Sequence, residues 1–280
     1  MKALAVLALM LAVAAPGAAG DAGGTIVFAR SLDAGDRLEA VEGDGSAPHE
    51  LLRGARLEDP AWSPDGSRIA LAVTGGLALV SADGSGLVQL TRNARDADPA
   101  WSPDGTRLAF TRTVGGNQDL HALTLADGRV TRLTSARARD QEPAWSPDGT
   151  TIAFSSQRTG NWELFVMDAD GRRERRLTRT GVAEGFPAWS PDGTTLAFWR
   201  RTPAGIRIHV LAGGRVRRVT AGPGNDYDPA WSPDGARLAF VSDRGGLPQL
   251  HVAAADGSGA APVTARGGFP SGPAWRPGLR

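Results

Sequence analysis

The sequence predicts an all-β fold: a six-bladed β-propeller with four antiparallel strands per blade. Three observations lead to this prediction. The string PAWSPDG occurs five times, a shortened copy follows near the end, and successive copies begin 39 to 44 residues apart. Between the copies, apolar and polar residues alternate over short runs that end at Gly, Asp or Asn. A repeat of about 40–45 residues with four short strands is typical of a propeller blade.

The chain begins with a predicted export signal, residues 1–20. Lys2 precedes an unbroken apolar run from Ala3 to Ala15, and Pro16 and several small residues follow before Asp21. The run is shorter than the roughly 20 apolar residues that a membrane span needs, and its flanks are those of a cleavable signal peptide. A buried N-terminal helix is the alternative. We therefore expect residues 21–280 to form the mature propeller, either periplasmic or secreted.

Each repeat contains four strand segments in a fixed order. The first is the PAW segment, which starts at Pro60 in the first copy, and the SPDG turn follows it. In that turn Pro supplies a φ near −65° and Gly a positive φ, the pattern of a type I turn with a bulge. The second and third strands are apolar runs such as Leu108–Phe110 and Glu163–Met167. A turn such as Ala82-Asp83-Gly84 then leads to a fourth strand that ends in a segment like Gln89-Leu90-Thr91. The SPDG aspartates are therefore turn residues without a catalytic role.

The number of strand copies predicts how the ring closes. The mature chain starts with a second-strand copy at Thr25–Phe28 and ends with PAW at Pro273–Trp275. If the last PAW is the innermost strand of the first blade, each strand type occurs six times and no blade keeps an open inner edge. A linear solenoid is the alternative, and it would leave the first strand unpaired. We expect the repeat tryptophans and Trp199 to lie in the core. The six repeat tryptophans are Trp62, Trp101, Trp145, Trp189, Trp231 and Trp275.

Composition excludes several classes of function. The chain has 31 basic and 30 acidic side chains and a formal net charge of +1, so no basic surface for nucleic acid is indicated. It has no cysteine, which excludes disulfides, Cys-ligated zinc, thiol catalysis and a lipid-anchored lipobox cysteine. We expect a monomer with no nucleic-acid partner and no membrane insertion after signal cleavage.

The repeats also carry a resemblance to a known family. PAWSPDG followed by Ile152–Phe154 and Met167–Gly171 resembles the propeller repeat of the TolB family, and related repeats occur in prolyl-oligopeptidase-type enzymes. The resemblance extends over about residues 25–278. It implies a propeller like that of a periplasmic component of the Tol–Pal envelope system. We expect the α/β domain that precedes the propeller in TolB to be missing, because the first strand closely follows the predicted cleavage site.

Propeller geometry divides the connections between two faces, named face T and face B here. Face B carries the SPDG and Asp-Gly turns, and face T carries the second-to-third-strand loops and the junctions between blades. We expect long, varied loops on face T at 113–119, 156–163, 200–207 and 243–249. Variable loops on a rigid scaffold commonly form binding sites, so we predict that a protein partner binds there, ordinary solvated loops being the alternative. The candidate residues are Arg158, Trp162, Phe186, Arg200 and Arg201.

Acidic residues gather ahead of the PAW segments. The position just before PAW is acidic in four of six copies, and so is the position two residues earlier. Since residues i and i−2 of an extended strand share a side, we expect these carboxylates to converge at the channel mouth on face T. Such a cluster attracts a cation or a basic partner segment. The alternative is that each acid pairs with a nearby arginine (Arg56, Arg95, Arg137 or Arg139) or bonds backbone amides. The eight candidates are Asp59, Asp96, Asp98, Asp140, Glu142, Glu184, Asp226 and Asp228.

Oxygen ligands suit Ca²⁺, so the sequence allows a calcium site at Asp98, Glu142 and Asp228, although no cofactor is required. His121, His209 and His251 occupy the third-strand position that Phe165 holds in another repeat, and we expect them to pack in the blades instead of binding one metal.

Enzyme signatures are absent from the sequence, which has no Gly-x-Ser-x-Gly elbow and no phosphate-binding Gly loop. We therefore favour an exported, non-enzymatic protein-interaction module of TolB-like type. The first alternative is a propeller enzyme of unrecognised class, a saccharide lyase or a peptide hydrolase acting at the channel mouth. The second is a sensor or accessory propeller.

Overall fold

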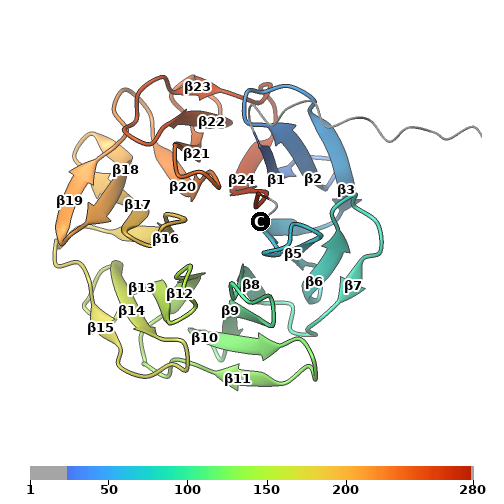
Figure 1. Ribbon diagram of the computed structural model, residues 1–280, viewed down its shortest axis with the longest axis vertical. Coiled ribbons are helices and arrows are strands. Elements are labelled where there is room, and N and C mark those ends of the chain that lie inside the picture. The colour runs from blue at the N-terminus through green and yellow to red at the C-terminus, as the bar shows by residue number, and fades with distance from the viewer. Residues whose placement is uncertain (1–23, 279–280) are drawn as a thin grey trace, which may run out of the picture.

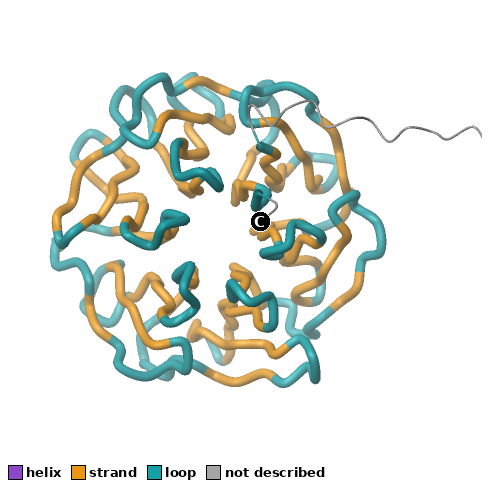
Figure 2. Tube along the Cα trace, viewed as in Figure 1, coloured by secondary structure: helices purple, strands orange, loops and turns teal. Residues whose placement is uncertain are grey.

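The computed structural model describes residues 24–278 as six four-stranded antiparallel sheets arranged around a central axis (Figure 1). This confirms the predicted six-bladed propeller. Loops and turns join the strands at both faces of the ring (Figure 2). Within residues 24–278 no helix is long and apolar enough to cross a membrane. The predicted signal peptide, residues 1–20, lies outside the described residues.

Each blade has four strands, from an innermost strand at the axis to an outermost one, and blade 1 is the blade that contains the first strand of the chain. The innermost strands are β24 (Phe269–Trp275), β4 (Leu57–Trp62), β8 (Asp96–Trp101), β12 (Asp140–Trp145), β16 (Glu184–Trp189) and β20 (Asp226–Trp231). The second strands are β1 (Thr25–Ser31), β5 (Arg68–Val73), β9 (Arg107–Val114), β13 (Thr151–Ser156), β17 (Thr195–Thr202) and β21 (Arg237–Ser242). The third strands are β2 (Asp36–Glu42), β6 (Gly76–Ser81), β10 (Asn117–Thr124), β14 (Glu163–Asp168), β18 (Gly205–Ala212) and β22 (Gln249–Ala254). The outermost strands are β3 (His49–Gly54), β7 (Val88–Gln89), β11 (Val130–Arg132), β15 (Arg175–Arg176), β19 (Arg215–Arg218) and β23 (Ala261–Pro262).

The two ends of the described chain close the ring within blade 1. Strand β24 pairs antiparallel with β1, with Trp275 opposite Ile26 and Ala274 opposite Val27. Beyond the strand, the Arg276 backbone N–H donates to the Thr25 carbonyl oxygen at 2.7 Å. In Figure 1 the red β24 lies beside the blue β1. The predicted closure by the last PAW segment is therefore confirmed.

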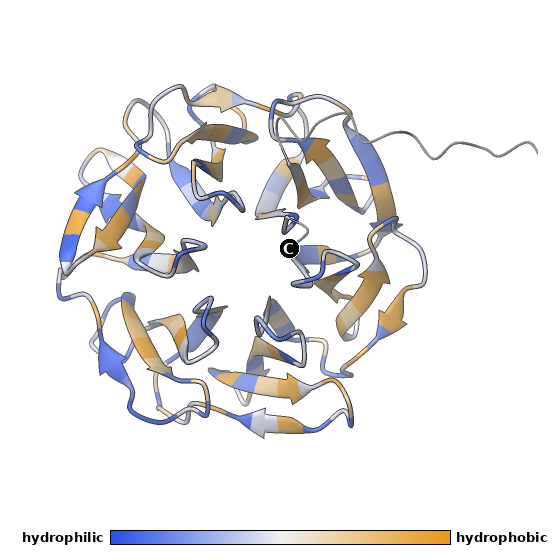
Figure 3. Ribbon diagram, viewed as in Figure 1, coloured by the Kyte–Doolittle hydropathy of each residue, from blue (hydrophilic) through white to orange (hydrophobic). Residues whose placement is uncertain are grey.

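The hydrophobic core lies mainly between neighbouring blades. Apolar and polar bands alternate along the strands (Figure 3), because successive side chains of a strand point to opposite faces. One cluster, for example, joins Ala70 and Leu77 of blade 2 to Leu108 and Phe110 of blade 3. Burying one such side chain stabilises the fold by roughly 1.5–3 kcal/mol, so each blade depends on its neighbours. The fully buried second-strand phenylalanines are Phe28, Phe110, Phe154, Phe198 and Phe240.

Two of the predicted long loops on face T are short. Strands β9 and β10 are joined by Gly115-Gly116 alone, and both glycines have positive φ. Strands β17 and β18 are joined by residues 203–204. The expected loops at 113–119 and 200–207 are therefore mostly strand, because a tight two-residue turn lets the hairpin pair to its tip. Blades 4 and 6 do carry longer connections, at 157–162 and 243–248.

The repeat tryptophans do not share one environment. Four of them are 6–8% exposed, whereas Trp189 and Trp231 are only partly buried, as is Trp199. The expectation that these residues lie in the core is met by the four buried ones, and the other three pack against core clusters while staying partly exposed. An arginine guanidinium covers each of the four buried indoles, but Thr151 and Thr195 occupy the corresponding positions beside the other two repeat tryptophans. The four buried ones are Trp62, Trp101, Trp145 and Trp275.

Candidate functional site

Each innermost strand has a β-bulge at the residue just before PAW. In blade 3, for example, the register of β8 against β9 shifts between Ala97 and Ala100. This residue has a φ of 50–59° in all six blades, a conformation that L-amino acids seldom adopt. The bulge separates the residue from its neighbour two positions earlier, so the expectation that both acids share one side is wrong. The six bulge residues are Asp59, Asp98, Glu142, Phe186, Asp228 and Gly272.

The acids two positions earlier lie inside the blades and pair with arginine. Arg112 Nε and Nη2 each donate to a carboxylate oxygen of Asp96 at 2.7 Å, and the Asp96 side chain is fully buried. The Arg112 guanidinium also lies 5.1 Å from the centre of the Phe110 ring. The same arrangement recurs in three further blades, as the pairs Asp140–Arg158, Glu184–Arg200 and Asp226–Arg244.

These four acids therefore pair with arginines, as the alternative predicted, but the arginines are not the ones that were expected. They come from the end of the second strand or the loop after it, 16 to 18 residues along the hairpin. Arg56, one of the expected partners, pairs with Glu58.

The bulge carboxylates form a chain of hydrogen bonds from blade to blade. Asp59 accepts from the Asp98 backbone N–H at 3.3 Å, and Asp98 accepts from that of Glu142 at 3.4 Å. Glu142 accepts from the Phe186 N–H at 2.7 Å, and Asp228 accepts from the Gly272 N–H at 3.4 Å. The chain of acceptors is interrupted at Phe186 and Gly272, which have no carboxylate. The alternative that the acids bond backbone amides thus describes these four residues.

These carboxylates lie in an unfavourable electrostatic environment. Burial, with Asp98 close by, raises the pKa of Glu142 to about 8. Burial raises the pKa of Asp228 to about 6, with a smaller contribution from the charge of Asp98. Burial also raises the pKa of Asp59 and that of Asp98, and the negative charge of Asp98 acts further on Asp59. Around the axis, protons are therefore held to higher pH than on isolated carboxylates.

The structure places no metal-binding group at this position. Among the side chains of residues 24–278, no three His, Asp or Glu groups lie close enough together to hold a metal ion. The calcium site at Asp98, Glu142 and Asp228 stays a prediction from the sequence. Three histidines pack against phenylalanines within their blades, as expected, and burial lowers the pKa of each. The ring centres of Phe110–His121, Phe198–His209 and Phe240–His251 are 5.7, 6.0 and 5.9 Å apart.

Beside the bulge residues, face T carries an aromatic pocket of about 450 Å³ between blades 5, 6 and 1. Phe186, Trp199 and Tyr227 line it together with Phe269, which is 65% exposed. Asp228 and Asp243 supply carboxylates to the wall, and Arg201 supplies a cation. The pocket can therefore accept an apolar side chain while a charged group next to it stays in contact with water.

The five predicted loop residues are distributed over two different environments. Phe186 and Arg201 line the pocket, whereas Arg158 and Arg200 are held in ion pairs inside blades 4 and 5. Trp162 is partly buried. Tyr227, Asp243 and Phe269 also line the pocket and were not among the predicted site residues.

Sequence signals for two of these three were available. Tyr227 is the only tyrosine of the chain. Phe269 occupies a repeat position that is polar or alanine in the other five copies. The residues at this position in the other five copies are Arg56, Arg95, Arg139, Ala183 and Asn225.

Comparison with known proteins gives a consistent result. The family model for the TolB beta propeller domain matches residues 37–211 and 182–278. Similar solved structures include TolB from Acinetobacter baumannii, which is 24% identical with a TM-score of 0.83, the match covering 92% of this chain and 68% of that chain. They also include a putative TolB from Agrobacterium tumefaciens, at 22% identity and a TM-score of 0.73 over 89% of this chain and 91% of that chain.

An oligogalacturonate lyase in complex with manganese is less similar, at 16% identity and a TM-score of 0.61, covering 86% of this chain and 74% of that chain. No curated protein matched the chain in sequence. At these levels of identity the structural likenesses show the fold.

Proposed function

Because the chain belongs to the TolB beta propeller domain family, we propose that it is an exported, non-enzymatic module that binds a partner protein over face T. The observation that supports this most directly is the aromatic pocket between blades 5, 6 and 1. Aromatic side chains are common anchors of protein interfaces, and Phe269 is exposed at the rim of the pocket. Packing of the blades accounts for only part of this aromatic surface, because Trp199 packs against the core of blades 5 and 6 whereas Phe269 is 65% exposed.

The charges around the pocket indicate the kind of partner segment. Asp228 belongs to the axial group of carboxylates and Asp243 lies on the loop after β21. An apolar or aromatic side chain of the partner would fill the pocket, and a neighbouring basic residue would face these carboxylates. Such an arrangement combines a desolvated anchor with charge complementarity at the rim. Binding would need no rearrangement of the blades.

The proposal is tested with the mature chain, residues 21–280, immobilised and exposed to an envelope fraction of its host. A retained protein is identified, purified and titrated against the wild-type chain, Phe269→Ala and Leu87→Ala. Leu87, which is 50% exposed on face B, is the matched control. We expect Phe269→Ala to weaken binding by about tenfold, which corresponds to the loss of an aromatic contact worth about 1.4 kcal/mol, and Leu87→Ala to have no effect.

Equal affinity of the two variants would contradict a binding site on face T. The alternative function, an enzyme acting at the channel mouth, is tested in parallel with libraries of oligosaccharides and peptides. Turnover by the wild-type chain that is lost in Asp228→Asn would overturn the non-enzymatic part of the proposal. Turnover that persists in this variant would still contradict a purely binding function and would place the chemistry elsewhere on the ring.

A further inference from the structure

On face B, arginine guanidinium groups lie over the repeat tryptophans at four of the six junctions between blades. The arginine that begins the second strand of blades 2, 3 and 6 covers the indole of the next blade, as Arg107 covers Trp145 at 4.7 Å and Arg237 covers Trp275 at 4.8 Å. Arg68 does the same for Trp101, and Arg276 covers Trp62, at 5.4 and 5.2 Å. Each of these four junctions thus has a slot, a space over the indole face that an arginine guanidinium fills.

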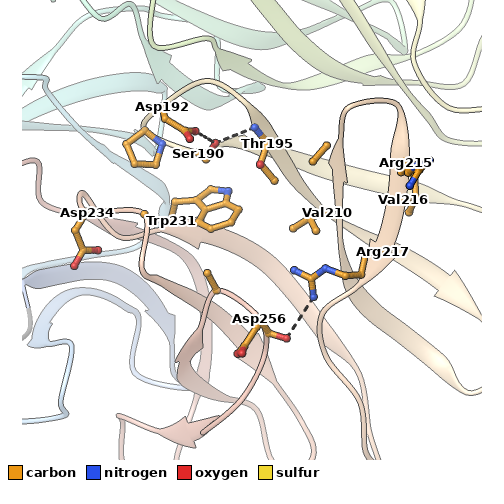
Figure 4. Close-up of a pocket in the computed structure, with 14 residues that line it drawn as sticks. Ser190, Asp192, Thr195, Val210, Arg215, Val216, Arg217, Trp231, Asp234 and Asp256 are labelled. Carbon is orange, nitrogen blue, oxygen red and sulfur yellow. Dashed lines mark hydrogen bonds between the residues drawn. The ribbon is translucent and has the colours of Figure 1, made fainter.

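At the junction of blades 5 and 6 the slot has no arginine of its own. Thr195 occupies the position of Arg107, and the short threonine side chain leaves the indole of Trp231 partly exposed. A groove of about 730 Å³ opens there, with Trp231 in its centre and Val210 beside it (Figure 4). The four covered tryptophans therefore indicate that a guanidinium group would fit against the indole of Trp231.

We propose that this groove binds an arginine side chain of a partner protein, with its guanidinium over the face of Trp231. The neighbouring junction of blades 3 and 4 provides the template. There Arg107 lies over Trp145 and its Nη1 also donates to the Ala169 carbonyl oxygen at 3.5 Å. Ala255 is the equivalent of Ala169 in blade 6, and it lines the groove. A cation over an indole is attracted by the negative face of the ring, most strongly where water is excluded.

The charges that line the groove are compatible with an incoming cation. Three aspartates line it, Asp192, Asp234 and Asp256, together with the two arginines Arg215 and Arg217. Arg217 already donates to the backbone oxygen of Asp256 at 3.4 Å. Hydrogen bonds from nearby serine and threonine groups lower the pKa of Asp192, and serine and backbone hydrogen bonds lower that of Asp234 and of Asp256. These carboxylates therefore stay charged at neutral pH.

The junction of blades 4 and 5 also lacks the arginine, because Thr151 occupies the position of Arg107 next to Trp189. It differs from the junction of blades 5 and 6 in one respect. The turn after β18 is Gly213-Gly214, so it has no counterpart of Asp256. A cation there would face one carboxylate fewer. This junction serves as the internal control for the groove at Trp231.

The test follows the indole N–H resonances of the mature chain by NMR during titration with the blocked tripeptide acetyl-Gly-Arg-Gly-amide. Trp231→Phe assigns the resonance of Trp231. We expect that resonance to shift in a saturable manner, and the citrulline tripeptide, which is neutral but of equal shape, to bind about tenfold more weakly. An unmoved Trp231 resonance, or equal binding of the two tripeptides, would overturn the proposal.

Two substitutions separate the groove from other sites. Thr195→Arg supplies the arginine in the manner of Arg107 and should abolish binding at Trp231 while the melting temperature stays at or above that of the wild type. Thr151→Arg, the matched change at Trp189, should leave binding intact. If Thr195→Arg bound the peptide as well as the wild type, the slot would not be the site. If that variant folds poorly, Asp256→Asn tests the same groove, because it leaves the indole in place and removes one carboxylate. We expect it to weaken arginine binding severalfold.

Discussion

The Glu142 carboxylate accepts a hydrogen bond of 2.7 Å from the backbone N–H of Phe186, one blade further around the ring. The two residues occupy the same repeat position, and both have a positive φ. The left-handed bulge and the acidic side chain thus belong together, because the acid of one blade bonds the amide of the next bulge. Four acidic residues before PAW therefore have a structural reason as well as any role in binding.

Glu142 should make the protein less stable as the pH rises. Its pKa is raised to about 8 in the folded chain, against an ordinary value of 4.5. Between these values the folded state holds a proton that the unfolded chain has lost, so stability is complete below the unfolded pKa and falls as the pH increases through 8. We expect a loss of up to about 4 kcal/mol from this group, measured by chemical denaturation at pH 5 and pH 8.5.

Glu142→Gln should remove most of that loss, since an amide does not titrate and can still accept from Ser155 and Phe186. Asp127→Asn, at an exposed turn, is the control and should keep the wild-type dependence on pH. A variant at Glu142 with an unchanged slope would mean that Asp59, Asp98 or Asp228 dominates the titration.

The buried pair of Asp96 and Arg112 should be costly to break and cheap to replace. Arg112→Val alone leaves a fully buried carboxylate without its partner, which we expect to lower the free energy of unfolding by about 3–5 kcal/mol. Blade 2 carries Leu57 and Val73 at the two equivalent positions. The double change Asp96→Leu, Arg112→Val copies that blade and should recover most of the loss. Urea denaturation of both variants decides, and a double variant as unstable as the single one would refute this account.

How far the sequence predicts this protein depends on the range of the interaction. The blades and their closure follow from local repeats, since Trp275 needs only its PAW motif to be placed opposite Ile26. The pairing of Asp96 with Arg112 was missed because it depends on the register of β8 against β9, which the bulge at Asp98 shifts. The aromatic pocket was missed in part because Phe186 and Phe269 come from blades 5 and 1, and the sequence does not show how the ring brings them together.

His251 should be replaceable by phenylalanine. In blade 4, Phe165 occupies the equivalent position, with its ring centre 5.9 Å from that of Phe154, so the blade accommodates this side chain. Burial lowers the pKa of His251. The unfolded chain then binds a proton as the pH falls below about 6.5, and the histidine destabilises the fold there. We expect His251→Phe to change the free energy of unfolding by less than about 1 kcal/mol at pH 7.5. At pH 5 the variant should be more stable relative to the wild type than it is at pH 7.5.

Closure of the ring should depend on β24. A chain ending at Gly268 lacks β24, so β1 loses its inner partner, and the indole of Trp275, 6% exposed in the intact protein, is removed from the core between blades 1 and 6. Trp275→Ala alone should cost about 3–5 kcal/mol, and the truncation more, because β4 and β20 also lose a neighbour. We therefore expect the truncated chain to show no cooperative thermal transition by circular dichroism. Phe269→Ala, which changes an exposed residue of the same strand, is the control and should melt like the wild type. A truncated chain that melted with it would show that blade 1 is stable without its C-terminal strand.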